Sequence, residues 1–161
     1  MAQLSKITPF LWYAEKAQET AQFYCSIFPD SKVDSVAVMN ADSPSGPPGS
    51  VEVVEFTLFG VSFTAMKAGG ADAFNHSISL VVACDDQAEV DKYWDELGNG
   101  GTYEACSWLR YKYGLAWQST PKALTEMMKS KDKAAAGRVA QSMMTMVKLD
   151  VATLQKAFDG K

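Results

Sequence analysis

The side chains best able to do chemistry are few, and they recur at similar places in the chain. His76 is the only histidine, and it opens the apolar segment 76–84. Gln118 is a lone polar residue that follows the apolar run 115–117, and Thr64 stands at the corresponding place in the earlier segment EFTLFGVSFTAM. An imidazole and a carboxamide can both hydrogen-bond a ligand, and an imidazole can also bind a metal ion.

Other reactive groups give a weaker signal. The three cysteines are widely spaced and form no C-x-x-C pair, which favours buried thiols in a reducing cytoplasm over disulfides or a zinc site. With a single histidine available to activate them, no cysteine nucleophile is predicted. Glu52 and Glu55 lie in an otherwise apolar strand. One of them could face a pocket as an acid–base group, or both could lie on an exposed edge.

Hydrophobic periodicity predicts the elements that position these residues. The first half reads as a strand, a helix, a strand and a hairpin that turns at Gly60, over residues 7–13, 14–28, 33–39 and 51–66. The second half repeats this order over residues 76–84, 85–97, 102–106 and 108–120, with its hairpin turning at Gly114. Asp85 or Asp86 is expected to cap the second helix, with Glu89 in its first turn.

The repetition indicates a duplicated fold. A shift of 70 residues places Phe23-Tyr24 on Tyr93-Trp94, and a shift of 54 places Phe59-Gly60 on Tyr113-Gly114. Two amphipathic helices can be alike by chance, but the matching hairpins favour duplication. We therefore predict a domain over 1–120, built from modules at 6–67 and 76–120, and a helical extension over 121–161.

The extension is rich in helix formers over 122–129, 133–147 and 150–158. It also carries an unusual number of methionines, namely Met127, Met128, Met143, Met144 and Met146. These helices could cover one edge of the sheet, or they could form a subunit interface, since methionine suits adaptable surfaces. Both interpretations stay open.

Composition excludes some classes of partner. The net charge of −4 gives no basic surface, so nucleic acid is not expected. No apolar run reaches the length of a membrane span, and residues 1–10 lack a signal-peptide core. We therefore expect a cytoplasmic protein without a membrane partner.

The chain resembles the vicinal oxygen chelate superfamily, which includes glyoxalase I, bleomycin- and fosfomycin-resistance proteins and extradiol dioxygenases. Within it, the similarity is greatest to PhnB-like proteins, also called the 3-demethylubiquinone-9 3-methyltransferase domain. The segments that carry this resemblance are ITPFLWY, AQFYCSIFPDS, VEVVEFTLFGVSFTAM, FNHSIS, EVDKYWDEL, WLRYKYGLAWQSTP and RVAQSMMTMVKLDVATLQKAF. The resemblance implies an α+β fold in which paired βαβββ modules form a cupped mixed sheet, followed by C-terminal helices. It also implies a homodimer, and it leaves the activity undefined.

The resemblance also suggests where a metal would bind. His76 and Gln118 correspond to the places where fosfomycin-resistance proteins hold a ligand histidine and glutamate, and Lys6 or Thr8 and Thr64 correspond to the others. A catalytic metal needs about three ligands drawn from histidine and carboxylate. Gln118 is a weak ligand and Lys6 would repel a cation, so we expect a pocket without a cofactor. A divalent metal on His76, Gln118 and possibly Glu55 is the alternative.

Strand alternation counted from His76 and Gln118 predicts that Thr64, Met66, Ile78, Leu80 and Ala116 line the same pocket. The first strand offers Thr8, Phe10 and Trp12, and Trp108 and Arg110 could close the rim. The aromatic members could instead fill the core. Such a pocket suits a small aromatic or apolar ligand bound without a metal. The alternatives are a metal-dependent lyase or oxygenase of the glyoxalase type, and an interaction module acting through the Met-rich helices. The glycines at 69–70 and 98–101 do not lie between a strand and a helix, so methyl transfer from S-adenosylmethionine is not supported.

Overall fold

The computed structural model of the chain describes residues 5–161. The chain forms two compact units, of which the first ends at Ala73 and the second begins at Phe74. Two predictions, the absence of a signal-peptide core and the domain start at residue 1, depend on residues 1–4, which lie outside the described part. Within residues 5–161, no helix combines the length and the apolar character needed to cross a membrane.

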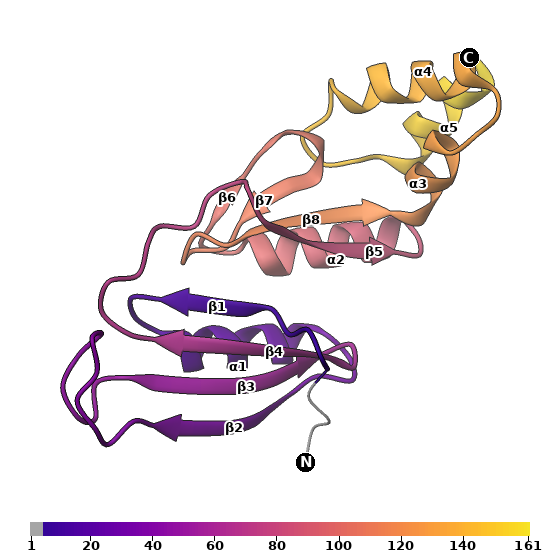
Figure 1. The fold of residues 1–161 in the computed structure, drawn as a ribbon. Helices are drawn as coiled ribbons and strands as arrows, with labels where there is room; N and C mark the ends of the chain where they lie inside the picture. The colour runs from indigo at the N-terminus through magenta and orange to yellow at the C-terminus, as the bar shows by residue number, and fades with distance from the viewer. Residues whose placement is uncertain (1–4) are drawn as a thin grey trace. The chain divides into compact units, whose positions relative to one another are not determined.

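The first unit is a mixed sheet with one helix packed against it (Figure 1). The strand order is β1-β4-β3-β2, and β1 runs parallel to β4. The elements are β1 (Phe10–Tyr13), α1 (Ala17–Ile27), β2 (Lys32–Val38), β3 (Glu52–Leu58) and β4 (Val61–Lys67). The predicted hairpin is therefore formed by β3 and β4, and it turns at Gly60, whose φ of 75° suits glycine.

Alternation in β1 separates the two faces of the first sheet. Leu11 and Tyr13 are 2% and 3% exposed, and Leu11 is the register partner of the buried Ala65. Phe10 and Trp12 point the other way and are 56% and 36% exposed. These two rings therefore do not fill the core beneath α1, and they leave an aromatic surface on the open face of the sheet.

The second unit repeats this arrangement, which confirms the doubled strand–helix–strand–strand–strand order. Its sheet has the order β5-β8-β7-β6, again with the first strand parallel to the last strand of the hairpin. The elements are β5 (Ser79–Cys84), α2 (Gln87–Gly98), β6 (Thr102–Tyr103), the short 3₁₀ turn η1 (Ala105–Ser107), β7 (Trp108–Arg110) and β8 (Ala116–Pro121). Asp86 caps α2 as predicted, because its Oδ1 accepts a hydrogen bond from the Glu89 amide at 2.9 Å.

The extension belongs to the second unit, where β8 leads directly into it. It contains α3 (Lys122–Met128), α4 (Lys133–Met143) and α5 (Val151–Asp159). These helices share a small core of Leu124, Met127, Val139, Leu149 and Leu154, against which Met143 and Met146 pack. Met128 and Met144 are 41% and 69% exposed. Some methionines thus fill the extension's own core, and the subunit interface stays a prediction.

The late start of β5 changes which side chains share a face. β5 starts at Ser79, and His76 lies in the turn that precedes it rather than on the strand. Val81 is the register partner of Gln118 in the parallel pair, whereas Leu80 is the partner of Trp117. The open face of β5 therefore carries Val81 and Ala83. The prediction of Leu80 on that face is wrong, because alternation was counted from a residue outside the strand. Ile78 also precedes the strand and is 50% exposed.

Candidate functional site

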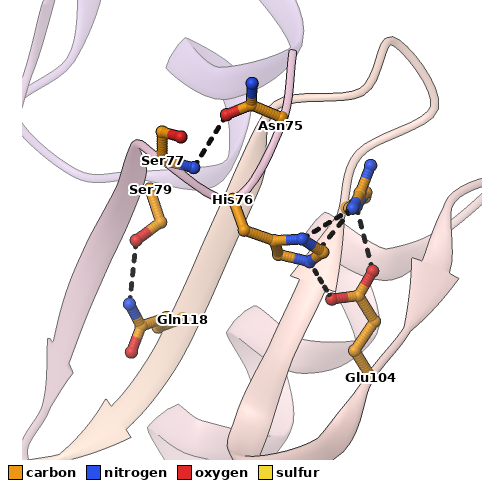
Figure 2. A network of polar contacts seen from close by, with 7 residues as sticks. Asn75, His76, Ser77, Ser79, Glu104 and Gln118 are labelled. Atoms are coloured by element: carbon orange, nitrogen blue, oxygen red, sulfur yellow. Dashed lines mark hydrogen bonds and ion pairs between the residues drawn. The ribbon is translucent and has the colours of Figure 1, made fainter.

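A polar cluster of His76, Glu104 and Arg110 lies at one end of the second sheet. His76 Nε2 lies 2.6 Å from Glu104 Oε2, and Arg110 Nε donates to Glu104 Oε1 at 2.9 Å. Arg110 Nη2 is 2.9 Å from His76 Nδ1 and 3.1 Å from Nε2. Figure 2 shows the His76 ring and the Glu104 carboxylate turned toward each other. The three side chains therefore form a closed hydrogen-bonded ring.

The imidazole of His76 links the other two side chains. Its Nε2 faces the Glu104 carboxylate as the donor, and its Nδ1 lies within hydrogen-bond distance of the Arg110 guanidinium. The hydrogen bond from His76, followed by the charges of His76 and Arg110, outweighs desolvation and lowers the pKa of Glu104 below its ordinary value. Glu104 is thus a carboxylate at neutral pH, and both imidazole nitrogens are engaged.

Trp108 and Gln118 extend the cluster across the open face of the sheet. They are register partners in the antiparallel β7–β8 pair, so their side chains lie side by side. Gln118 points away from α2, because its neighbours Trp117 and Ser119 are buried and Ser119 Oγ donates to the Val90 carbonyl of that helix. Gln118 Nε2 donates to Ser79 Oγ at 2.8 Å (Figure 2).

An aromatic surface is formed where His76 meets Trp108. The two ring centroids are 5.6 Å apart, with an angle of 65° between the planes, which is an edge-to-face contact. Trp108 is only partly buried, and the His76 side chain is 50% exposed. A flat ligand could therefore lie against these rings while a polar group reached Arg110.

An open depression of about 400 Å³ adjoins Arg110 and Glu104. Its other walls come from the loop at 100–102 and from the hairpin end at 111–114, including Lys112. The loop runs so close that a Cβ on Gly101 would lie 1.9 Å from the Arg110 carbonyl oxygen. Glycine at 101 is therefore a steric requirement for the backbone that carries Arg110.

The first unit carries the other predicted pocket residues on its own open face. Phe10, Thr64 and Glu55 form a row across β1, β4 and β3, since Thr64 is the register partner of both others. Glu55 Oε2 accepts a hydrogen bond from Ser35 Oγ at 2.8 Å. Thr8 precedes β1 and bonds locally, donating to the Ser5 carbonyl at 3.2 Å.

The residues suggested for a metal do not fit one. Both nitrogens of His76 are engaged, and the guanidinium at 2.9 Å would repel a cation. Gln118 supplies a neutral carboxamide, and Glu55 belongs to the first unit, where it binds Ser35. Across residues 5–161, no three side chains of His, Cys, Asp or Glu are grouped so that they could hold an ion. No step of chemistry is therefore derived through a metal.

The cysteines do not offer an activated nucleophile. Burial, followed by the charge of Asp34, raises the pKa of Cys25 to about 11, so its thiol is protonated at neutral pH. Burial also raises the pKa of Cys84, which is fully enclosed and contacts Ser119 Oγ at 3.5 Å. Cys106 Sγ lies 3.6 Å from the Met143 carbonyl, away from the imidazole contacts described above.

Glu104 is the site residue that the sequence did not reveal. The segment 102–106 reads as a plain short strand, and its only carboxylate resembles a solvated side chain. In the structure β6 is two residues long, and Glu104 follows it, with its amide donating to the Trp108 carbonyl at 2.8 Å. A signal was present, since a carboxylate six residues before Arg110 in a hairpin can reach across it.

Glu104 should stabilise the fold in a pH-dependent way. Its folded pKa lies below the unfolded value, so the stabilisation is complete above the unfolded pKa and is lost as pH falls through the folded pKa. Glu104→Gln should therefore lower the free energy of unfolding by about 0.5–1 kcal/mol at pH 7, a modest effect because the partners are partly exposed. Urea unfolding checks this. The difference should shrink below about pH 4, and a difference that is unchanged in acid would contradict it.

The comparisons with known proteins place the chain in a family. A sequence model of the family described as 3-demethylubiquinone-9 3-methyltransferase matches residues 5–120. The chain belongs to this family. The match ends at Thr120, so the extension lies outside it. No curated protein matches the chain.

Solved structures agree with the family assignment. A Bacillus cereus protein described as a 3-demethylubiquinone-9 3-methyltransferase and PhnB protein is 31% identical, with a TM-score of 0.64. The alignment covers 73% of this chain and 99% of that one. A Pseudomonas aeruginosa protein shares the fold at 17% identity and a TM-score of 0.50, over 70% of this chain and 94% of its own. The PhnB-like resemblance is thereby confirmed, together with an α+β fold of two mixed four-stranded sheets.

Proposed function

We propose that this protein binds a small aromatic molecule that carries an acidic oxygen, and that it does so without a metal. The observation that carries the proposal is the hydrogen bonding of the Arg110 guanidinium. Its Nε and Nη2 serve Glu104 and His76, while Nη1 meets no acceptor among residues 5–161. A guanidinium with spare donors is well suited to a carboxylate or phenolate.

The neighbours of Arg110 support the aromatic part of the ligand. Trp108 lies two residues away on the same strand and therefore on the same face, and the His76 ring packs against it. A ligand ring can stack on these side chains while its acidic oxygen accepts from Nη1. Gln118, directly opposite Trp108, leaves its Oε1 available for a ligand hydroxyl, since its Nε2 donates to Ser79.

The first unit supplies further candidates for ligand contact. Phe10 and Trp12 expose their rings, and Thr64 and Glu55 add polar groups on the same open face. These groups suit the same class of ligand, and they form a surface of the first unit by itself.

The family description names methyl transfer to a quinone precursor, and this bears on the ligand more than on the reaction. A hydroxylated aromatic ring is the kind of molecule that Trp108, Arg110 and Gln118 could hold. The glycines at 98–101 end α2 and do not lie between a strand and a helix, which is where a dinucleotide-type cofactor loop is found. The proposal is therefore one of binding, with no transfer step assigned.

Calorimetric titration with 4-hydroxybenzoate tests the proposal. We expect a dissociation constant on the order of 0.1–1 mM, because a ligand of about ten heavy atoms on an open site gains little free energy per atom. Benzamide, which lacks the charge, and cyclohexanecarboxylate, which lacks the aromatic ring, should each bind more weakly. Equal binding of all three, or binding that requires added zinc, would overturn the proposal.

We also expect a homodimer and a reducing, cytoplasmic compartment. The homodimer can be measured by sedimentation equilibrium, and the exposed Met128 and Met144 are the first positions to substitute if a dimer is found. The free thiols of Cys25, Cys84 and Cys106 support a reducing, cytoplasmic compartment.

A further inference from the structure

The turn that joins two site residues has an unusual backbone. η1 lies directly between Glu104 and Trp108. Within it, Cys106 and Ser107 both have a φ of 59°, in the left-handed region that side chains other than glycine rarely adopt. Two such residues in succession do not persist unless the surroundings hold them in place.

The surroundings that hold this turn come from the C-terminal extension. The amide of Cys106 donates to the Met146 carbonyl at 2.9 Å, and the amide of Ser107 donates to the Val147 carbonyl at 2.7 Å. In the opposite direction, the Leu149 amide donates to Ser107 Oγ at 2.9 Å. Ser107 is fully buried, so these hydrogen bonds are shielded from water.

The segment 146–149 is itself anchored to the second module. Gln87 at the start of α2 donates to the Leu149 carbonyl at 3.1 Å and accepts from the Val151 amide at 2.8 Å. Lys148 forms an ion pair with Asp91 of the same helix at 2.9 Å. The buried Leu149 side chain belongs to the extension's core. The segment is therefore fixed on both sides of the point where it meets η1.

We infer that the extension is part of the binding site, because its segment 146–149 holds the turn that positions Glu104 and Trp108. Ser107 is then a positioning residue, which acts on the ligand through its two neighbours. Glu104 also orients Arg110 through a hydrogen bond. A displacement of η1 would therefore move the Arg110 guanidinium as well. The expected change in ligand affinity rests on the proposed function. The expected loosening of the turn does not.

Ser107→Ala tests the inference by removing the acceptor for the Leu149 amide. Amide hydrogen exchange in the free protein should accelerate at least about tenfold at Glu104, whose N–H donates to the Trp108 carbonyl, and at Cys106. The affinity for 4-hydroxybenzoate should fall about three- to tenfold, because misplaced contacts are lost in part. Ser107→Gly should lose affinity similarly, since glycine suits the backbone but also lacks the hydroxyl.

Matched variants separate this role from general loss of stability. Thr145→Ala removes a hydroxyl that bonds only within the extension, donating to the Ser142 carbonyl, and should leave affinity and Glu104 exchange unchanged. Gln87→Ala loosens the segment from its far side and should reproduce the effect of Ser107→Ala. Unchanged Glu104 exchange in Ser107→Ala overturns the inference whether or not the ligand binds. If the wild type fails to bind the probe while exchange responds as expected, only the proposed function fails.

Discussion

Arg110→Ala is expected to weaken the binding of 4-hydroxybenzoate by roughly ten- to a hundredfold. A hydrogen bond between charged groups contributes about 1.5–3 kcal/mol, and each 1.4 kcal/mol or so is a factor of ten in affinity. The substitution also leaves the Glu104 carboxylate without its guanidinium partner, so that it repels an anionic ligand. Calorimetry with benzamide alongside shows whether the loss concerns the charge, because benzamide should lose little.

Two controls sharpen this result. Arg138→Ala removes the other arginine, whose guanidinium binds the carbonyls of Ala157 and Phe158 in the extension, and should not change the affinity. Arg110→Lys keeps the charge but loses the planar fork and should give an intermediate affinity. If Arg110→Ala bound the carboxylate as tightly as the wild type, Arg110 would have no part in recognition.

Trp108→Ala is expected to weaken the same ligand by about three- to thirtyfold. Contact between aromatic rings contributes about 0.5–1.5 kcal/mol beyond the burial of apolar area, and the indole also supports the His76 ring. Trp108→Phe should retain most of the affinity because it keeps an aromatic face. The affinities are measured by calorimetry with 4-hydroxybenzoate and with cyclohexanecarboxylate, for which the loss should be smaller.

Phe59→Ala is the control for the loss of a partly exposed ring. Phe59 lies at the turn of the first hairpin, is 48% exposed and packs on Phe28. Its substitution should leave the affinity unchanged. An equal loss in Trp108→Ala and Phe59→Ala would mean that the effect is a general one and that Trp108 is no binding surface.

The sequence was sufficient to predict the repeated order of elements, since each element has a strong local signal. The stripes of α1 and α2 and the turns at Gly60 and Gly114 agree with the structure. The duplicated pattern also agrees with the same strand order being found in both sheets. The local preferences of each segment therefore agree with the topology of the whole fold.

The site was predicted less well, because it depends on where a strand begins and on a contact across a turn. Arg110, Gln118 and Trp108 share a face, since all lie within the β7–β8 ladder. His76 lies outside β5, so its face could not be counted by alternation. Glu104 was missed because its partners come from a turn and a neighbouring strand, and no periodicity links such residues.

The role of the extension was also beyond sequence reasoning. Its methionines suggested either helices that cover an edge of the sheet or a subunit interface. Both of these roles depend on side-chain contacts. The contact that joins it to the site is made mainly by backbone groups of Met146, Val147 and Leu149, which meet Cys106 and Ser107. Backbone hydrogen bonds of this kind leave almost no trace in the residue types.

The sole histidine allows a direct test of the central claim, which is metal-free binding of an aromatic acid beside His76. Its imidazole gives a single set of ring signals in a proton nuclear magnetic resonance spectrum. On titration with 4-hydroxybenzoate in the presence of a chelator, these signals should shift and saturate, and the Arg110→Ala signals should need far more ligand to shift. Signals that stay unmoved at saturating ligand, or that move only after zinc replaces the chelator, would contradict the account.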